Sequence, residues 1–213
     1  MGREIITHRI GLPTHPMSPT FAMPFSLVGF TLALILATVG HEVGHLVAAK
    51  ALHIPVKLIA FGLGPTLWRR SFANGVRFEW RLVPVGMAVG LPGRRSETGE
   101  DRRSWKQDLT VAAGGPLASL LLMAALIVLA VFIRSDPATQ SWLIATAAVS
   151  LLLAFYNLLP LPGLDGGHIL VLSAARLGLR LSPQREAMLH RTGLKLIATV
   201  CMLLLAVRMA SAA

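Results

Sequence analysis

Two histidines and a glutamate interrupt the apolar stretch "TVGHEVGHLVAAKAL" at residues 38–52. His41 and His45 are four residues apart, so on a helix their imidazoles lie on one face and can bind the same ion. Glu42 follows the first histidine, and in an H-E-x-x-H helix this carboxylate serves as the general base for the water that a bound zinc activates. We therefore predict that His41 and His45 bind zinc and that Glu42 is catalytic.

Chance could also produce so short a pattern, with histidines that only hydrogen-bond within a protein core. The apolar surroundings argue against this alternative. An ionisable side chain within a membrane span costs about 2 to 3 kcal/mol and usually has a partner or a function. The close grouping of three such side chains in an apolar stretch therefore favours a functional site.

The composition places the chain among membrane proteins. Of its 213 residues, 54% are hydrophobic and only 14% are charged, which is hard to reconcile with a water-soluble globule. A membrane-spanning helix needs about 20 apolar residues. The fold class that we expect is an all-α polytopic membrane protein with about four transmembrane helices, near residues 25–52, 109–133, 142–161 and 194–210.

The positive charge of the chain predicts its orientation in the membrane. The formal net charge is +10, but no nucleic-acid motif accompanies the basic residues, so we expect no nucleic-acid partner. Lys and Arg concentrate between the first two spans and after the third, whereas the connection between the second and third holds only Arg134. The positive-inside rule then places both basic segments in the cytoplasm and both termini outside.

A β-hairpin is expected between the first two spans. Asn74-Gly75 lies between alternating runs in "WRRSFANGVRFEWRL", residues 68–82, which is a strong hairpin signal. The apolar, glycine-rich residues 83–93 follow, and such backbone is tolerated at membrane depth only against protein or a water-filled cavity. We expect the hairpin and a membrane-associated loop over residues 56–93, and then a solvated charged linker over residues 93–107.

The remaining segments add little chemistry. Residues 1–23 are rich in Pro, His and Thr and predict a flexible tail, which leaves residues 24–213 as a single domain. The one cysteine, Cys201, excludes a disulfide framework and a cysteine-rich metal site. Gly114 and Gly115 are interpreted as small residues that let two membrane helices pack closely.

A zinc site of this type needs a third protein ligand and an open position for water. Asp165 is the best-placed acid, because two prolines and three glycines break the helix in "FYNLLPLPGLDGGHIL", residues 155–170. Asp-Gly is also a common turn, so residue chemistry alone leaves a ligand and an ordinary turn equally open. We interpret His168 as a supporting or interfacial residue, and residues 165–181 predict an amphipathic helix along the cytoplasmic face.

Two distant motifs together resemble the site-2 protease family of intramembrane zinc metalloproteases: H-E-V-G-H in the first span and N-x-x-P-x-P-x-L-D-G-G at residues 157–167. Residues 112–119, "AAGGPLAS", and 82–89, "LVPVGMAV", are similar to that family's glycine-rich motif and membrane-associated β-loop. The resemblance covers most of residues 24–170. It departs from the family pattern at Ser119, where many relatives have asparagine, and at "PVGMAV", which replaces a more usual proline and Gly-Gly-Tyr-like segment.

The resemblance implies one zinc ion per chain with three protein ligands, His41, His45 and Asp165. Glu42 would then be the general base beside them. The resemblance also implies that Asn157 binds the substrate backbone or the oxyanion. Separately, we expect Val85 and Gly86 to bind the substrate, because residues 77–90 offer a strand edge with which an extended peptide could pair. For Asn157, a helix-capping or packing role is the alternative.

The activity that the resemblance implies is hydrolysis of peptide bonds in or near transmembrane segments of membrane proteins. Its partners would be the lipid bilayer and a transmembrane or membrane-anchored protein substrate, in the inner membrane of a bacterial cell with the active site toward the cytoplasm. The chain looks like a minimal member without PDZ or CBS domains. A proteolytically inactive relative that binds membrane helices, or a transporter, stays open as an alternative. The intact Glu42 and the absence of inverted sequence repeats favour the protease.

Overall fold

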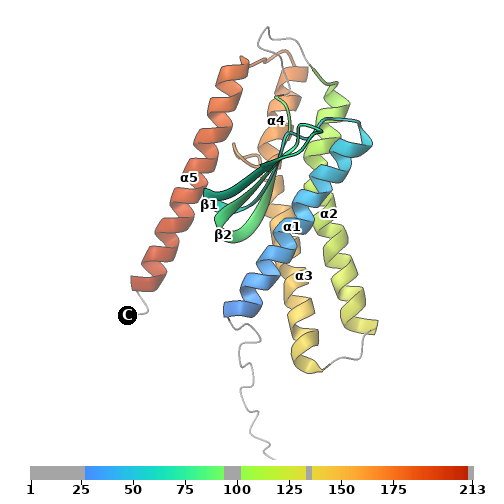
Figure 1. Cartoon of the computed structure of the whole chain (residues 1–213), viewed down its shortest axis with the longest axis vertical. Helices are drawn as coiled ribbons and strands as arrows, with labels where there is room; N and C mark the ends of the chain where they lie inside the picture. Colours follow the sequence, from blue (N-terminus) through green and yellow to red (C-terminus); the bar gives the residue numbers. More distant parts are fainter. Residues whose placement is uncertain (1–26, 94–101, 133–135, 211–213) are drawn as a thin grey trace, which may run out of the picture.

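The structure is a computed structural model that describes residues 27–93, 102–132 and 136–210. In chain order the described elements are α1 (Leu27–Ala51), β1 (Leu58–Ser71), β2 (Arg77–Gly90), α2 (Trp105–Phe132), α3 (Pro137–Leu158), α4 (Asp165–Arg176) and α5 (Pro183–Ala210). Helices α1, α2 and α3 form a bundle, and the two strands lie along one side of α1 (Figure 1). The predicted tail over residues 1–23 and most of the predicted linker lie outside the described residues.

Among the described residues, three helices are long and apolar enough to cross a membrane: α1 from Val28, α2 and α3. They overlap the first three predicted spans, although α2 begins at Trp105 instead of residue 109 and α3 covers Pro137–Leu158 instead of residues 142–161. Helix α5 covers the fourth predicted span but begins at Pro183, and its first half carries charged residues such as Arg185 and Lys195. The fourth span therefore stays a prediction.

Helices α1 and α2 cross where both lack bulky side chains. A Cβ atom on Gly44 would meet the carbonyl oxygen of Gly114 and would lie 2.5 Å from Cβ of Ala118. A Cβ atom on Gly114 would in turn lie 2.8 Å from the carbonyl oxygen of Gly44. Small residues of this kind let membrane helices approach until their backbones touch, so the α1 turn that holds His45 is pressed against α2.

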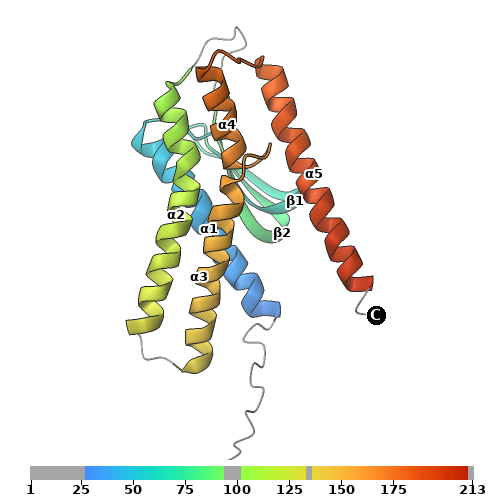
Figure 2. The ribbon, with the colours of Figure 1, turned by 180° about the vertical axis from the view of Figure 1, so that it is seen from behind.

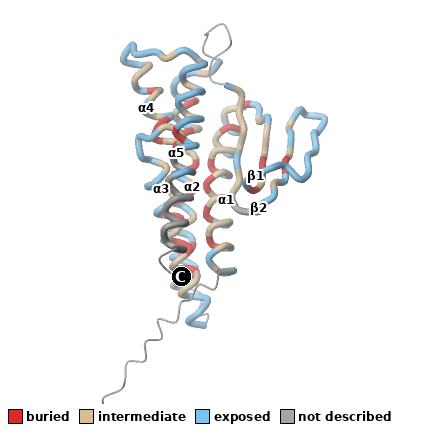
Figure 3. The backbone as a smooth tube through the Cα atoms, turned by 90° about the vertical axis from the view of Figure 1, so that its left-hand side faces the viewer, coloured by how far each residue is buried: buried red, intermediate tan, exposed pale blue. Residues whose placement is uncertain are grey.

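Helix α3 completes the bundle at the end away from the site. Leu126 and Ala130 of α2 pack with Leu143 and Ala147 of α3 as a buried cluster, and the indole of Trp142 donates to the carbonyl of Gly29 at 2.9 Å. The outer faces of the helices stay exposed (Figure 3). Apolar side chains on the outside suit a helix bundle surrounded by lipid.

The two strands pair with each other in three places, because each strand bends. Near the Asn74-Gly75 turn, Arg69–Ser71 run antiparallel to Arg77–Glu79, and the amide of Phe72 donates to the carbonyl of Val76 at 2.9 Å. The predicted hairpin is thereby confirmed. Further along, Leu58–Phe61 lie between Arg77–Trp80 and Met87–Gly90 and pair with both.

The bends of the strands occur at glycines in the left-handed region. Gly62 has φ +92° and Gly86 has φ +85°, values that other residues rarely adopt. The resulting curled sheet protrudes from one side of the molecule (Figure 3). Strand β2 packs on α1, and its last residues, Met87–Gly90, reach the turn of α1 that carries Glu42.

The chain breaks sharply between α3 and α4, as the prolines and glycines predict. Helix α3 ends at Leu158, Gly163 has φ +97°, and α4 begins at Asp165. A Cβ atom on Gly166 would collide with the carbonyl oxygen of Leu158, so the turn is folded tightly back on the end of α3. Helix α4 agrees with the predicted helix over residues 165–181 but ends at Arg176.

Candidate metal centre

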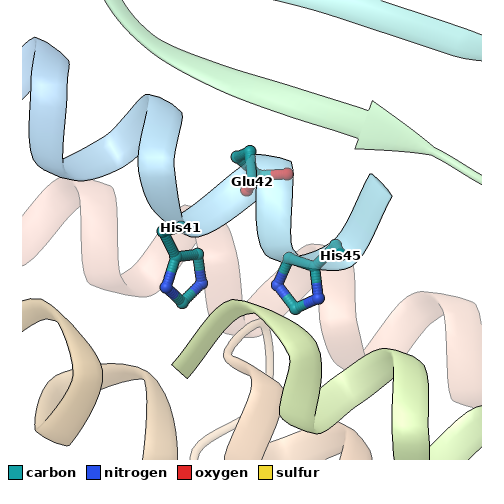
Figure 4. Close-up of side chains that lie close together, drawn as sticks. All are labelled: His41, Glu42 and His45. Atoms are coloured by element: carbon teal, nitrogen blue, oxygen red, sulfur yellow. The ribbon is translucent and has the colours of Figure 1, made fainter. Parts of the chain in front are cut away.

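His41 and His45 extend from successive turns of α1 toward the same space (Figure 4). Their ring centroids are 5.0 Å apart and the ring planes are nearly perpendicular, at 80°. The side of the helix that they occupy faces α2 and the start of α4. The helical spacing of the motif therefore places two imidazoles where one ion could contact both.

Asp165, at the first position of α4, reaches both histidines. Its Oδ2 lies 3.1 Å from Nε2 of His41, and its Oδ1 lies 3.3 Å from Nε2 of His45. Burial alone would raise the pKa of Asp165, but the hydrogen bonds with His41 and His45 outweigh it and lower this pKa below its ordinary value. The structure thus brings the predicted third ligand, 124 residues from His41 in the chain, to the histidine pair as an anion.

The other nitrogen of each imidazole is held from α2. Nδ1 of His45 lies 2.7 Å from the carbonyl oxygen of Val111, and Nδ1 of His41 lies 2.9 Å from Oγ of Ser119, which is fully buried. A carbonyl oxygen only accepts, so Nδ1 of His45 carries a proton, and whenever the imidazole is neutral Nε2 is left with a lone pair for a metal ion. This is the usual orientation of a metal-binding histidine.

The donor set fits a cation. Lone pairs on the Nε2 atoms of His41 and His45 would face the negative carboxylate of Asp165, an arrangement that a positive ion between them stabilises. Neighbouring ligand atoms of tetrahedral zinc lie about 3.3 Å apart, given metal–ligand distances of about 2.0–2.2 Å. The observed 3.1 and 3.3 Å agree with that spacing.

Gly115 keeps the space between the imidazoles clear. A Cβ atom at this position would lie 2.6 Å from Nε2 of His41 and would also collide with Nε2 of His45. The sequence suggested only a close-packing role for Gly115. In the structure the missing side chain leaves room beside the atoms that would bind the metal.

Glu42 lies on a different face of α1, toward β2 (Figure 4). Its Oε2 accepts a hydrogen bond from the amide of Val89 at 3.0 Å. Ligand atoms of His41, Glu42 and His45 nevertheless all lie within 4.8 Å of one another. A base in this place can reach a water bound at the histidines while a strand amide holds its other side.

A cavity of about 610 Å³ opens beside these residues. Its walls come from α1, the end of β2, α2, the turn before α4, α4 itself and α5. The residues that line the cavity include Glu42, His45, Val89, Asp165, His168 and His190.

A largely covered arginine closes the wall between β2 and α2. Arg103 donates from Nε to Oδ1 of Asp108 at 2.6 Å and from Nη1 to the carbonyl of Pro92 at 2.8 Å. Only 14% of its side chain is exposed. The solvated linker expected over residues 93–107 therefore does not extend to Arg103, because Asp108 and Pro92 supply its partners.

The predicted substrate-binding residues lie in three different settings. Nδ2 of Asn157 donates to the carbonyl of Leu153 in its own helix at 3.0 Å, and Asn157 is not among the residues that line the cavity. Gly86 faces open space, since a Cβ atom there would meet nothing within 4 Å. Val85 precedes it in β2. Their substrate roles stay predictions.

The comparisons with known proteins agree with this geometry. Peptidase family M50 matches residues 29–141 and 135–200. The chain belongs to peptidase family M50. The site-2 protease resemblance expected from the motifs is thereby confirmed.

Two relatives show the extent of the similarity. The chain is 28% identical over 105 residues to the Regulator of sigma-E protease RseP of Escherichia coli, a match that covers 46% of this chain and 23% of that protein. It is 33% identical over 108 residues to a Chlamydia pneumoniae protein named as a zinc metalloprotease, covering 43% of this chain and 17% of that protein. The chain thus spans less than a quarter of the length of either relative.

A solved structure supports the fold. The Site-2 Protease from Methanocaldococcus jannaschii superposes with a TM-score of 0.52 and 20% sequence identity, over 85% of this chain and 68% of that one. At this identity the match concerns the arrangement of the elements only. It agrees with a mostly helical membrane fold that carries a small sheet after α1.

Proposed function

We propose that the chain is a zinc-dependent intramembrane endopeptidase that hydrolyses peptide bonds in or near transmembrane segments of membrane proteins. The observation that supports this most is the meeting of both oxygens of Asp165 with Nε2 of His41 and His45, beside Glu42. One zinc ion per chain would be held by these three ligands. The proposed location is a bacterial inner membrane, with the site toward the cytoplasm and both termini outside.

Each residue of the site has a role in peptide hydrolysis. Bound zinc would polarise the scissile carbonyl and lower the pKa of a coordinated water. Glu42 accepts the proton of the attacking water and returns it to the leaving amine. Ser119 and Val111 keep His41 and His45 turned toward the metal position, and the Val89 amide holds the carboxylate of Glu42 at the cavity wall.

The substrate must be extended before its peptide bond can reach this site, and β2 offers a strand for it to follow. Ala88 and Val89 line the cavity, and Val85 and Gly86 precede them in the same strand. We propose that the peptide pairs with this part of β2, and that Asn157 contacts the peptide backbone or the oxyanion. Cleavage that survives proline substitutions at Val85 and Met87 would contradict the strand-pairing proposal.

The decisive experiment compares the purified wild type with Glu42→Gln and Asp165→Ala in detergent. Zinc content and cleavage of a transmembrane test substrate are measured for each. Glu42→Gln should keep one zinc per chain and lose about 100- to 10,000-fold in cleavage rate, the usual contribution of a general base. Asp165→Ala should lose zinc and activity together.

Two results would overturn the proposal. Unchanged cleavage by Glu42→Gln would remove the base, and unchanged zinc in Asp165→Ala would remove the third ligand. A wild type that binds zinc and membrane helices but cleaves none would instead favour the inactive relative.

A further inference from the structure

Helix α5 meets the rest of the molecule at the turn before Asp165. It has no extensive contact with another described helix and stands apart from α1 and α2 in both Figure 1 and Figure 2. A hydrogen bond joins the two segments, because the amide of Gly163 donates to Nδ1 of His190 at 3.1 Å. Gly163 is only two residues before Asp165, so α5 touches the segment that delivers the third ligand.

At this crossing the backbone of α5 lies directly on the backbone of the turn. A Cβ atom on Gly163 would lie 2.8 Å from the amide nitrogen of Leu194, and one on Gly193 would collide with the carbonyl oxygen of Pro162. Glycine at both positions lets the two segments touch without an intervening side chain. The position of α5 along the turn is therefore restricted by contact as well as by the His190 hydrogen bond.

His190 also stacks on His168, which follows Asp165 by one turn of α4. The ring centroids are 3.7 Å apart and the planes differ by 17°. His168 lines the cavity, and burial together with the neighbouring His190 lowers its pKa to about 4. His168 is therefore uncharged at neutral pH, and burial also lowers the pKa of His190, which suits a stacked pair.

The hydrogen bond defines the chemistry of His190. Because the Gly163 amide donates, Nδ1 of His190 accepts and its proton is on Nε2. That Nε2 is buried and has no hydrogen-bond partner among the described residues. A buried donor without a partner is costly, so a phenyl ring would pack here more favourably if packing were the only role.

We propose that His190 is a positioning residue for the metal centre. By fixing the turn at Gly163, His190 holds the carboxylate of Asp165 in place beside His41 and His45. Metal sites require their ligands to be held within about 0.5 Å of the productive geometry. A turn released from α5 would let the Asp165 carboxylate move by more than that. The inference rests on the metal centre of the proposed function and extends it to a helix that supplies none of the three ligands.

Two substitutions of His190 separate the hydrogen bond from the stacking. His190→Phe keeps an aromatic ring against His168 but removes the acceptor for Gly163. His190→Asn places Oδ1 where Nδ1 was and keeps an acceptor without the ring. Gly193→Ala pushes α5 away from Pro162 while leaving His190 itself intact. Met188→Ala is the matched control, because Met188 is on the same helix and 69% exposed.

The readouts are the affinity of the full-length detergent-purified chain for Zn²⁺ and the visible spectrum of bound Co²⁺, which reports ligand geometry. His190→Phe and Gly193→Ala should weaken zinc binding by about 10- to 100-fold, the range found for groups that orient metal ligands, and should shift the Co²⁺ bands. His190→Asn and Met188→Ala should bind zinc as the wild type does.

Wild-type zinc affinity and an unchanged Co²⁺ spectrum in His190→Phe would overturn the inference. If that variant fails to fold, Gly193→Ala gives the same test with His190 in place, and wild-type zinc binding there would overturn it equally. A wild type that binds no zinc would instead refute the proposed function. Zinc binding that depends on Asp165 but not on these α5 residues would refute the α5 role alone.

Discussion

The two histidines proposed to bind the metal and the glutamate of α1 are supported by different kinds of structure. His41 and His45 are held from α2, by a buried hydroxyl and a helix carbonyl, at a crossing where glycines bring two backbones together. Glu42 is held by the amide of Val89, which lies near the end of β2 where this strand pairs with β1 in the curled two-stranded sheet. The metal position is thus fixed by helix packing, whereas the base is fixed by the strand that borders the cavity.

This difference predicts that substitutions on the two supports have separable effects. Changes on the α2 face should alter metal binding first and cleavage as a consequence. Changes that loosen the end of β2 should reduce cleavage while the metal stays bound. The expected effects below run from the largest to the smallest.

Gly115→Ala should weaken zinc binding the most, because its methyl group would enter the space beside Nε2 of both histidines. We expect a loss of affinity of about 100-fold or more, at the upper end of the effects of outer-shell changes. Zinc content after purification measures it. Leu117→Ala on the exposed side of the same helix is the control, and an alanine variant that retains stoichiometric zinc would show that Gly115 serves packing alone.

Ser119→Ala should weaken zinc binding by about 10- to 100-fold, because it removes the group that orients Nδ1 of His41. The hydroxyl is fully buried, so water cannot replace it easily. Titration with a competing chelator measures the affinity. Equal affinities of the variant and the wild type would mean that α1 alone orients His41.

Arg103→Met should reduce the cleavage rate by about 10-fold and leave the zinc content unchanged. Without Arg103 the end of β2 loses its bond to α2, so Val89 no longer holds Glu42 firmly. The expected size follows the lower range for groups that position catalytic residues. Arg102, the exposed neighbour, gives the control Arg102→Met. Cleavage and zinc content are measured on the same samples. Parallel loss of both would show that the two supports are not independent.

Asp136→Ala should change stability slightly and leave both supports intact. Asp136 caps α3 by accepting from the hydroxyl and amide of Thr139 and the amide of Ala138. These bonds, led by the Thr139 hydroxyl, lower the pKa of Asp136 below 3.8. The cap is therefore complete above that pH and is lost as the pH falls through the lowered pKa.

Thermal unfolding at several pH values measures this capping contribution. The melting temperature of Asp136→Ala should lie below that of the wild type at neutral pH, and the difference should shrink in acid. A difference that grows on acidification would contradict the assignment of the cap.

The elements that local sequence rules govern could be predicted. The four-residue spacing of His41 and His45 fixes a shared helix face, Asn74-Gly75 fixes a hairpin, and the prolines after Asn157 end α3. Asp165 could be assigned only through the family resemblance, because an Asp-Gly pair is equally typical of an ordinary turn. In the structure both carboxylate oxygens of Asp165 lie beside Nε2 of a histidine, a contact that supports the proposed ligand role.

The residues that support the site could not be predicted, because their partners depend on how the elements pack. Ser119 reaches His41 only through the angle at which α1 and α2 cross. Arg103 lies in a charged stretch of sequence, which usually indicates solvent, but most of its side chain is covered and it binds Asp108 and the carbonyl of Pro92. His190 is 27 residues from Gly163, and no motif in either segment predicts that the two residues are in contact.

The start of α4 has one further consequence. Leu164, the residue before Asp165, makes no side-chain capping bond, so the first turn of α4 depends on what holds Asp165. If zinc binds this carboxylate, occupancy of the metal site and folding of the first turn of α4 are thermodynamically linked, and each stabilises the other by the same free energy. The protein would then couple the presence of its metal to the order of a helix, and amide hydrogen exchange in α4 would slow when zinc is added.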